Sequence, residues 1–279
     1  MIFIREFNLP LPIFALQTSY PMQLEWYHYL VAVLGSALAG SINTLAGNGS
    51  AITLTILTEL IGLPGNLANG TNRIGIFTQS AAGTVAFWRN GKLHLGRSWL
   101  PITLNIIGAV IGVIVAVNVS NEEFKNVFRF LMVVMLFVIL IKPSRWLRST
   151  DIARKTNPWI AVPLYLALGF YGGFIQMGMG VFFLAVMVLY AHYSLVDANA
   201  VKIFVVGAYT FLVILIFQTQ GLIDWKIGLL MAVGQTAGGY VTAHYASRYE
   251  QANVWAHRLL IVVVILAIIK LFNLHQLFL

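Results

Sequence analysis

Residues 34–49 read LGSALAGSINTLAGNG, and an altered form of this stretch, LALGFYGGFIQMGMG, returns at residues 166–180. Each form is followed by a short apolar segment and then by a second shared pattern, which reads LANGTNR at 67–73 and DANAVKI at 197–203. An alignment through these patterns pairs Gly47 with Gly178, Gly49 with Gly180, Asn69 with Asn199, and Asn105 with Gln235. The chain is therefore predicted to contain one structural module twice.

Composition predicts the surroundings of both copies. The 279 residues are 59% hydrophobic and 9% charged, which leaves too little polar surface to cover a soluble globule. Because an apolar helix needs roughly 20 residues to cross a bilayer, we expect about eight crossings. They are predicted at 26–45, 71–87, 99–118, 124–141, 158–177, 199–217, 227–246 and 254–272. Two further apolar stretches, 50–63 and 180–191, are short and are expected either to cross or to re-enter as parts of broken helices.

The net charge of +8 reflects Lys and Arg residues that cluster in two predicted loops. Arg89, Lys92 and Arg97 lie in loop 88–98, and Lys142, Arg145, Arg148, Arg154 and Lys155 lie in loop 142–157. Short loops rich in Lys and Arg stay on the cytoplasmic side of a membrane. The charge therefore predicts topology, with both loops cytoplasmic and both termini outside, rather than nucleic-acid binding.

The predicted spans indicate an all-α polytopic membrane protein built from two repeats of inverted topology. Residues 1–25 form an N-terminal lead-in, 26–141 the first membrane repeat, 142–157 a basic cytoplasmic linker and 158–279 the second membrane repeat. Each repeat contains an odd number of crossings, so the second is expected to be inverted relative to the first. Architectures of this kind place substrate sites near the bilayer midplane, where broken helices meet.

The GNG triplet at 47–49 is the first candidate for such a site. Glycine permits backbone angles closed to other residues and lets a ligand approach exposed amides. A helix break there would direct free N–H groups at the start of segment 50–63 toward an anion. Neutral donors are available nearby from Asn43, Thr44, Asn48 and Ser50. The alternative is that these small residues only allow helices to pack closely.

Two cations, Arg73 and Lys202, lie just inside predicted spans at nearly matching places in the two halves. A cation in a span is costly unless it pairs, reaches the interface or faces a polar cavity. We expect both side chains to attract an anion, with snorkelling to lipid headgroups as the alternative. Gln79 and Gln176 are further polar groups inside spans, where they either hold helices together or line a cavity.

The sequence leaves the coupling ion open between a proton and sodium. Glu59 is the one carboxylate well inside an apolar stretch, and the following Pro64 and Gly65 predict an interfacial position for it. With no cysteine, the chain can form neither a disulfide nor a thiolate metal site. We expect no metal and no cofactor.

The same patterns resemble the TauE/SafE family of sulfite and organosulfonate exporters. The resemblance covers roughly residues 28–272 and rests on the glycine-broken segment, the short segment, ANGTNR at 68–73 and its degenerate copy ANAVK at 198–202. Matching positions are Gly47, Gly49, Asn69, Gly70, Thr71 and Asn72 in the first half, and Gly178, Gly180, Asn199 and Lys202 in the second. Asn48 departs from the longer glycine run of the family. The resemblance implies a secondary transporter of small anions such as sulfite, sulfonates or related carboxylates.

We therefore expect an exporter of a small anion in the cytoplasmic membrane, working by alternating access, with a homodimer as one possible assembly. The predicted substrate-binding residues are Asn43, Gly47, Asn48, Gly49, Asn69, Thr71, Asn72, Arg73, Gln176, Gly178, Gly180, Asn199 and Lys202. An anion channel and a membrane scaffold or sensor are the alternatives. His192 and Asp197 match a His-x4-Asp spacing seen in acyltransferases. Neither residue recurs in the first half, so an enzyme is not expected.

Overall fold

The computed structural model describes residues 24–89, 91, 93, 95, 96, 98–140, 156–245, 258, 262, 265 and 269. Their regular structure is entirely helical, which confirms the predicted all-α class. The α-helices are α1 (Trp26–Ala46), α2 (Gly49–Thr55), α3 (Gly65–Arg89), α4 (Trp99–Asn118), α5 (Asn121–Leu140), α6 (Pro158–Phe174), α7 (Met179–Ala185), α8 (Leu195–Thr219) and α9 (Trp225–Tyr245). Most of the predicted lead-in 1–25, most of linker 142–157 and most of span 254–272 lie outside the described residues.

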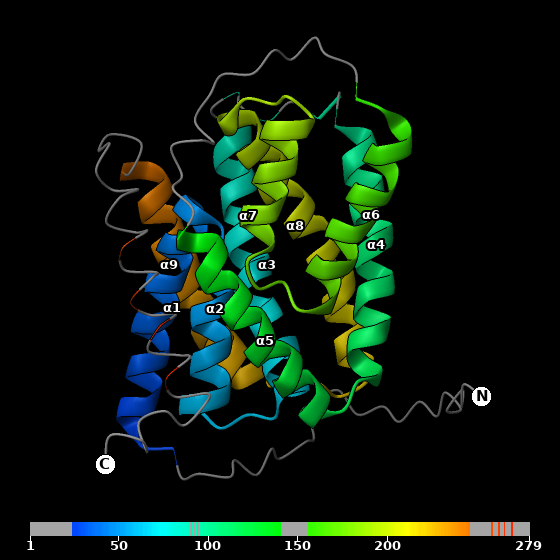
Figure 1. Cartoon of the computed structure of the whole chain (residues 1–279). Helices are drawn as coiled ribbons and strands as arrows, with labels where there is room; N and C mark the ends of the chain where they lie inside the picture. The colour runs from blue at the N-terminus through cyan, green and yellow to red at the C-terminus, as the bar shows by residue number, and fades with distance from the viewer. Residues whose placement is uncertain are drawn as a thin grey trace, which may run out of the picture.

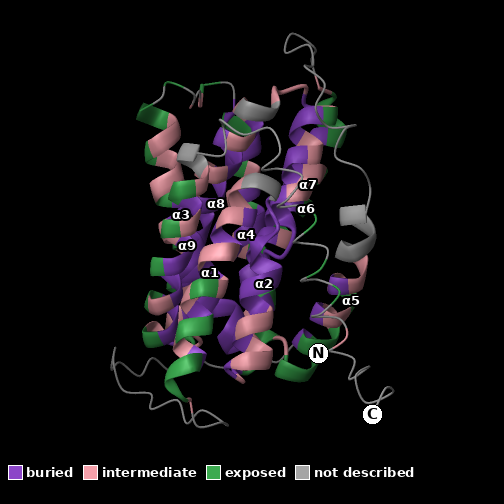
Figure 2. Ribbon diagram, turned by 90° about the vertical axis from the view of Figure 1, so that its left-hand side faces the viewer, coloured by how far each residue is buried: buried purple, intermediate pink, exposed green. Residues whose placement is uncertain are grey.

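The helices form one bundle in which α3 and α8 lie at the centre (Figure 1). Two extensive pairings flank this centre, α1 with α9 on one side and α4 with α6 on the other (Figure 1). Figure 2 shows buried residues gathering on the inner faces of the helices and exposed residues on the outer faces. The outer face of α4 is apolar, since Ile107, Ile111 and Ile114 are each about half exposed. Such a surface suits lipid better than water.

By length and composition alone, two helices in the described part of the chain could cross a membrane, Trp99–Asn118 and Asp197–Thr219. The central helix α3 is long enough but carries Asn69, Asn72 and Arg73, all of them buried. Polar residues lower the hydropathy of this helix while facing protein rather than lipid. The expectation of about eight crossings stays a prediction.

The first half begins with a helical hairpin that is closed by a glycine. Gly47 ends α1 with a left-handed φ of 74°, and α2 starts at Gly49. The chain then continues as a π-helix, η1 (Ile56–Leu60), so the short segment is one interrupted helix. Gly49 lies against Ala39 and Ile56 lies against Gly35, so α2 and η1 run back along α1. The short segment therefore turns back at the break.

The second half contains the same construction. The break after α6 has left-handed residues at Gln176 and Gly178, with φ of 65° and 71°. Helix α7 continues as a π-helix, η3 (Val186–Tyr190), with the same lengths as its counterparts in the first half. The Tyr190 hydroxyl donates a 2.8 Å hydrogen bond to the Asn157 carbonyl beside the start of α6. This short segment also runs back along the helix before it.

The two breaks meet backbone against backbone. A Cβ atom on Gly180 would lie 2.6 Å from the Gly47 Cα, and one on Gly47 would lie 2.9 Å from the Gly180 Cα. Both distances are shorter than any real contact of a Cβ atom. Only residues without side chains can therefore occupy these two positions together.

Glycines also permit the two flanking helix pairings. A Cβ on Gly40 of α1 would lie 2.9 Å from the Cα of Gln235 in α9, and one on Gly169 of α6 would lie 2.6 Å from the Cα of Asn105 in α4. This is the close packing by small residues that is common between membrane helices. Asn105 and Gln235 are the positions that the sequence alignment pairs, so the two contacts correspond.

The central helices run in opposite directions. Gly70 near the start of α3 lies against Phe217 near the end of α8, whereas Gly83 near the end of α3 lies against Ile203 near the start of α8. An antiparallel central pair is what an inverted repeat requires. The inverted topology within a bilayer stays a prediction that this arrangement supports.

Arg73 connects α3 to the second break. Its guanidinium is fully buried and donates to the carbonyls of Gly172 and Gly173 at 2.6 and 2.9 Å, near the end of α6. It also donates to the side-chain oxygens of Gln176 at 2.6 Å and Asn69 at 3.1 Å. Carbonyls at a helix C-terminus carry partial negative charge, and the planar guanidinium bonds several of them at once. Arg73 therefore stabilises the end of α6 and the turn that follows.

The contact between the breaks predicts that Gly180→Ala destabilises the protein. The added methyl group would overlap the backbone of Gly47, and overpacking of this kind costs about 1–3 kcal/mol. Thermal unfolding in detergent, followed by size-exclusion chromatography, should show a lower midpoint than wild type. Gly96→Ala is the control, because a Cβ at Gly96 would meet no atom within 4 Å. Equal midpoints for both variants would contradict the described contact.

The Arg73 network predicts a second loss of stability. Arg73→Met would leave buried carbonyls and the Gln176 side chain without their donor, and each such buried acceptor costs about 1–3 kcal/mol. Arg73→Lys should restore only part of the stability, because an ammonium cannot reproduce the planar fork. Arg89→Met removes an exposed arginine from the end of the same helix and should leave the unfolding midpoint unchanged. Wild-type stability in Arg73→Met would show that the network is dispensable.

Candidate functional site

A pocket lies beside the point where the two breaks meet. Gly47 and Gly180 both line it, and the remaining lining residues come mainly from α1, α3, α8 and α9. Its polar lining residues are Asn43, Thr44, Gln79, Ser80, Gln176, Lys202 and Tyr240. Ala82, Gly83, Ala86 and Phe87 line it from the second half of α3. The pocket therefore lies toward the end of the bundle where α3 leads into loop 88–98, which is predicted to be cytoplasmic.

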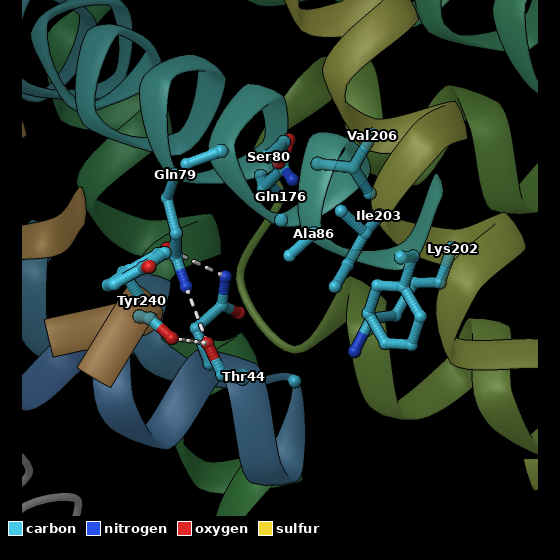
Figure 3. Close-up of a pocket in the computed structure, with 16 residues that line it drawn as sticks. Thr44, Gln79, Ser80, Ala86, Gln176, Lys202, Ile203, Val206 and Tyr240 are labelled. Atoms are coloured by element: carbon cyan, nitrogen blue, oxygen red, sulfur yellow. Dashed lines mark hydrogen bonds between the residues drawn. The ribbon is translucent and has the colours of Figure 1, made fainter. Parts of the chain in front are cut away.

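One wall of the pocket is a network of neutral side chains (Figure 3). The Gln79 amide nitrogen donates to the Gly40 carbonyl at 2.9 Å and to the Thr44 hydroxyl at 3.1 Å. The Asn43 amide donates to the Gln79 side-chain oxygen at 3.2 Å. The two bonds that Gln79 donates use both hydrogens of its amide and fix its orientation. The Asn43 amide uses one of its two hydrogens in this network. The Thr44 hydroxyl donates its own hydrogen to the Gly40 carbonyl at 2.9 Å. This wall can therefore offer an N–H of Asn43 to a ligand without carrying charge.

The opposite wall carries a single cation, Lys202 of α8 (Figure 3). Its side chain is 4% exposed, and its ammonium nitrogen has no hydrogen-bond partner among the described residues. No Asp or Glu is among the residues that line the pocket. Because a buried ammonium without a partner is costly, this position strongly favours an anion beside it. The side-chain oxygen of Asn199, one turn earlier in α8, also lacks a partner within the described structure.

The structure brings together five of the predicted site residues. Asn43, Gly47, Gln176, Gly180 and Lys202 line the same pocket, although they come from both halves of the chain. Gly178 forms the left-handed turn just before α7. Asn48 is fully buried between the glycines, and neither of its amide atoms has a partner in the described part of the chain. Asn48, Gly49 and Gly178 are not lining residues of the pocket.

The predicted residues of α3 lie elsewhere and bond to other parts of the protein. The Asn69 amide donates to the Phe174 carbonyl at 2.7 Å, beside its bond from Arg73. The Thr71 hydroxyl accepts from the Asp224 backbone N–H at 2.9 Å, and the Asn72 side-chain oxygen accepts from Gln235 at 3.3 Å. Asn69, Thr71, Asn72 and Arg73 are not among the lining residues, and their contacts connect α3 with α6 and α9.

Sequence reasoning did not assign Ser80 or Tyr240 to the site. Ser80 follows Gln79 inside the predicted span 71–87, and Tyr240 lies near the end of α9. The one signal near Tyr240 is the preceding pair Gly238 and Gly239, which indicates close packing there. In the described ranges, no group of three or more His, Cys, Asp or Glu side chains could hold a metal ion.

Comparison with known proteins identifies the family of this chain. A family model described as "Sulfite exporter TauE/SafE" matches residues 32–271. A "Probable membrane transporter protein ORF9" from Sinorhizobium sp is 31% identical over 255 residues, which cover 88% of this chain and 94% of that protein. A "Probable membrane transporter protein" from Haemophilus influenzae is 26% identical over 211 residues, covering 74% of this chain and 80% of the relative. No solved structure gives a significant match.

The family match covers most of the chain and includes both breaks, the central helices and every polar residue that lines the pocket. Both similar proteins are named as membrane transporters, which agrees with the apolar outer face of α4 and the polar pocket inside the bundle. The chain is a membrane protein that belongs to the TauE/SafE family of sulfite exporters.

Proposed function

We propose that this protein is a secondary transporter that carries a small anion out of the cell, across the cytoplasmic membrane. The observation that carries the proposal is the Lys202 side-chain nitrogen, which is buried in a pocket beside the two breaks and has no hydrogen-bond partner among the described residues. Sulfite, an organosulfonate or a related carboxylate is the proposed substrate. The description of the family as sulfite exporters supports both the class of anion and the direction.

The chemistry of the two pocket walls suits such an anion. Lys202 supplies the one positive charge, and hydrogen bonds between charged groups are stronger than those between neutral groups. Asn43 and Ser80 supply neutral donors, which distinguish an oxyanion from a halide by the direction of its oxygen atoms. We assign Arg73 to the support of the second break rather than to direct contact with the anion.

The proposed mechanism is alternating access between two inverted halves. Each half contributes a hairpin whose break touches the pocket, and the central helices α3 and α8, one from each half, pack against each other. In the described arrangement the pocket lies toward the end predicted to be cytoplasmic. Movement of one half against the other would open the site to the opposite side, as in other transporters with broken helices.

Anion flux in proteoliposomes tests the proposal. Vesicles loaded with sulfite, ethanesulfonate or lactate should release at least one of these anions in a saturable manner. Loss of a charge-assisted hydrogen bond costs about 1.5–3 kcal/mol, so Lys202→Gln should weaken binding by about 10–100-fold. Lys226→Gln is the matched control, because Lys226 is exposed and its ammonium lies 5.3 Å from the Tyr29 ring, outside the pocket.

Counterflow separates a carrier from an anion channel. A carrier should accelerate uptake of labelled anion when unlabelled anion is present inside the vesicles, whereas a channel should not. Wild-type flux in Lys202→Gln would refute the proposed site. Absence of flux for all three anions, in protein that elutes as a folded species, would refute the class of substrate.

A further inference from the structure

We propose that Lys202 carries the coupling proton, so that its amine takes up a proton when the anion binds and releases it when the anion leaves. This inference rests on the proposed function and adds the coupling ion to it. On the side where the anion enters, water supplies the proton to the Lys202 nitrogen. On the other side the anion dissociates and the proton returns to water. No other bond forms or breaks.

The inference begins with the surroundings of Lys202. The elements that pack against α8 are chiefly α3, α4, α6, α7 and η3. Their titratable and charged side chains in the described chain are Arg73 and Arg89 on α3, Tyr165 and Tyr171 on α6, and Tyr190 on η3. Tyr209 is buried in α8 itself, and Tyr240 of α9 is the only other titratable residue that lines the pocket. None of these groups is a carboxylate.

The carboxylate nearest to Lys202 along α8 is Asp197, which is hydrogen-bonded to Ser194. Asp197 lies in the first turn of the helix, where its side chain accepts a 2.7 Å hydrogen bond from the Ser194 hydroxyl. Arg73 is held by carbonyls and neutral side chains, so it neither supplies nor removes negative charge near Lys202. Among the described residues, therefore, no carboxylate lines the pocket or bonds the Lys202 nitrogen.

Two states of the pocket satisfy this electrostatic constraint. An isolated ammonium in a protein interior is so costly that the group tends to lose its proton instead. A bound anion removes that cost by pairing with the ammonium at close range. In the proposed cycle the empty pocket holds a neutral amine, and the filled pocket holds an ammonium beside an anion. In both states the net charge of the pocket is zero.

This equality has a consequence for transport. Moving a net charge through the low-dielectric interior of a membrane is expensive, and a membrane potential acts on it. A pocket that is neutral when empty and neutral when filled avoids both effects. Release of a monovalent anion should therefore be accompanied by about one proton per anion and should not respond to membrane potential.

Ethanesulfonate is the probe for this test, because its sulfonate group stays ionised near neutral pH and cannot carry the proton itself. Proteoliposomes loaded with ethanesulfonate and a pH-sensitive dye are diluted into medium without the anion, with the membrane potential set by potassium and valinomycin. The expected result is a rise in internal pH that follows ethanesulfonate release, at a rate independent of the potential. Release without a change in internal pH, or release driven by the potential, would overturn the inference while leaving the proposed function intact.

A substitution that keeps the charge but not the titration makes the test sharper. Arginine is effectively always protonated, so Lys202→Arg should still bind and exchange ethanesulfonate but should lose net release, since the empty pocket stays charged. Lys202→Gln should lose exchange and net release, and Lys226→Gln should match wild type. Proton-coupled net release by Lys202→Arg would overturn the inference. If Lys202→Arg does not fold, the wild-type dye experiment decides. Absence of both release and exchange in wild type would overturn the sulfonate assignment and this inference together.

Discussion

Gly47 and Gly180 touch backbone to backbone, and the convergence of the two hairpins on one region of the bundle depends on this contact. A side chain at either position would force the hairpins apart, because a Cβ atom would lie within 3 Å of the opposite Cα. With the breaks in contact, the ends of α1 and α6 and the starts of α2 and α7 converge on one region of the bundle. The pocket lies beside this region, and both glycines form part of its lining.

The two buried cations lie at positions that nearly match in the sequence alignment, yet their surroundings differ. Arg73 has four hydrogen bonds to protein oxygens, three of them on α6 and the turn after it, whereas the Lys202 ammonium has none among the described residues. A guanidinium suits the first role because it can bond several fixed carbonyls in one plane. An ammonium suits the second because it is a compact charge whose proton can be released when the site is buried. Arg73 is held by the frame of the bundle, and Lys202 is the cation that we propose binds the anion.

The features that the sequence predicted well are those with a local signal. Paired glycines located both breaks, and most apolar segments within the described residues coincide with helices, although α3 begins at Gly65, before the predicted start at 71. The sequence left open whether the short segments cross or re-enter, and the structure shows them turning back at the breaks. Asn69, Thr71, Asn72 and Arg73 are predicted to bind substrate, and the structure shows them hydrogen-bonded to other parts of the protein. These partners lie about 100 or more positions away in the chain, so the sequence could not indicate them. The set of residues that line the pocket could not be predicted from the sequence for the same reason. It combines Asn43 and Gln79 with Lys202 and Tyr240 across both halves, and no spacing rule links them.

The central claim is that a small anion binds beside Lys202, in the pocket next to the contact of the two glycine breaks. A crystal structure of the protein with bound selenite tests it most directly, because selenium marks the position of this sulfite analogue by anomalous scattering. The account predicts an anomalous peak within hydrogen-bond distance of the Lys202 nitrogen, facing the wall formed by Asn43, Thr44 and Gln79. A single strong peak elsewhere within the bundle, with no selenium beside Lys202, would contradict it.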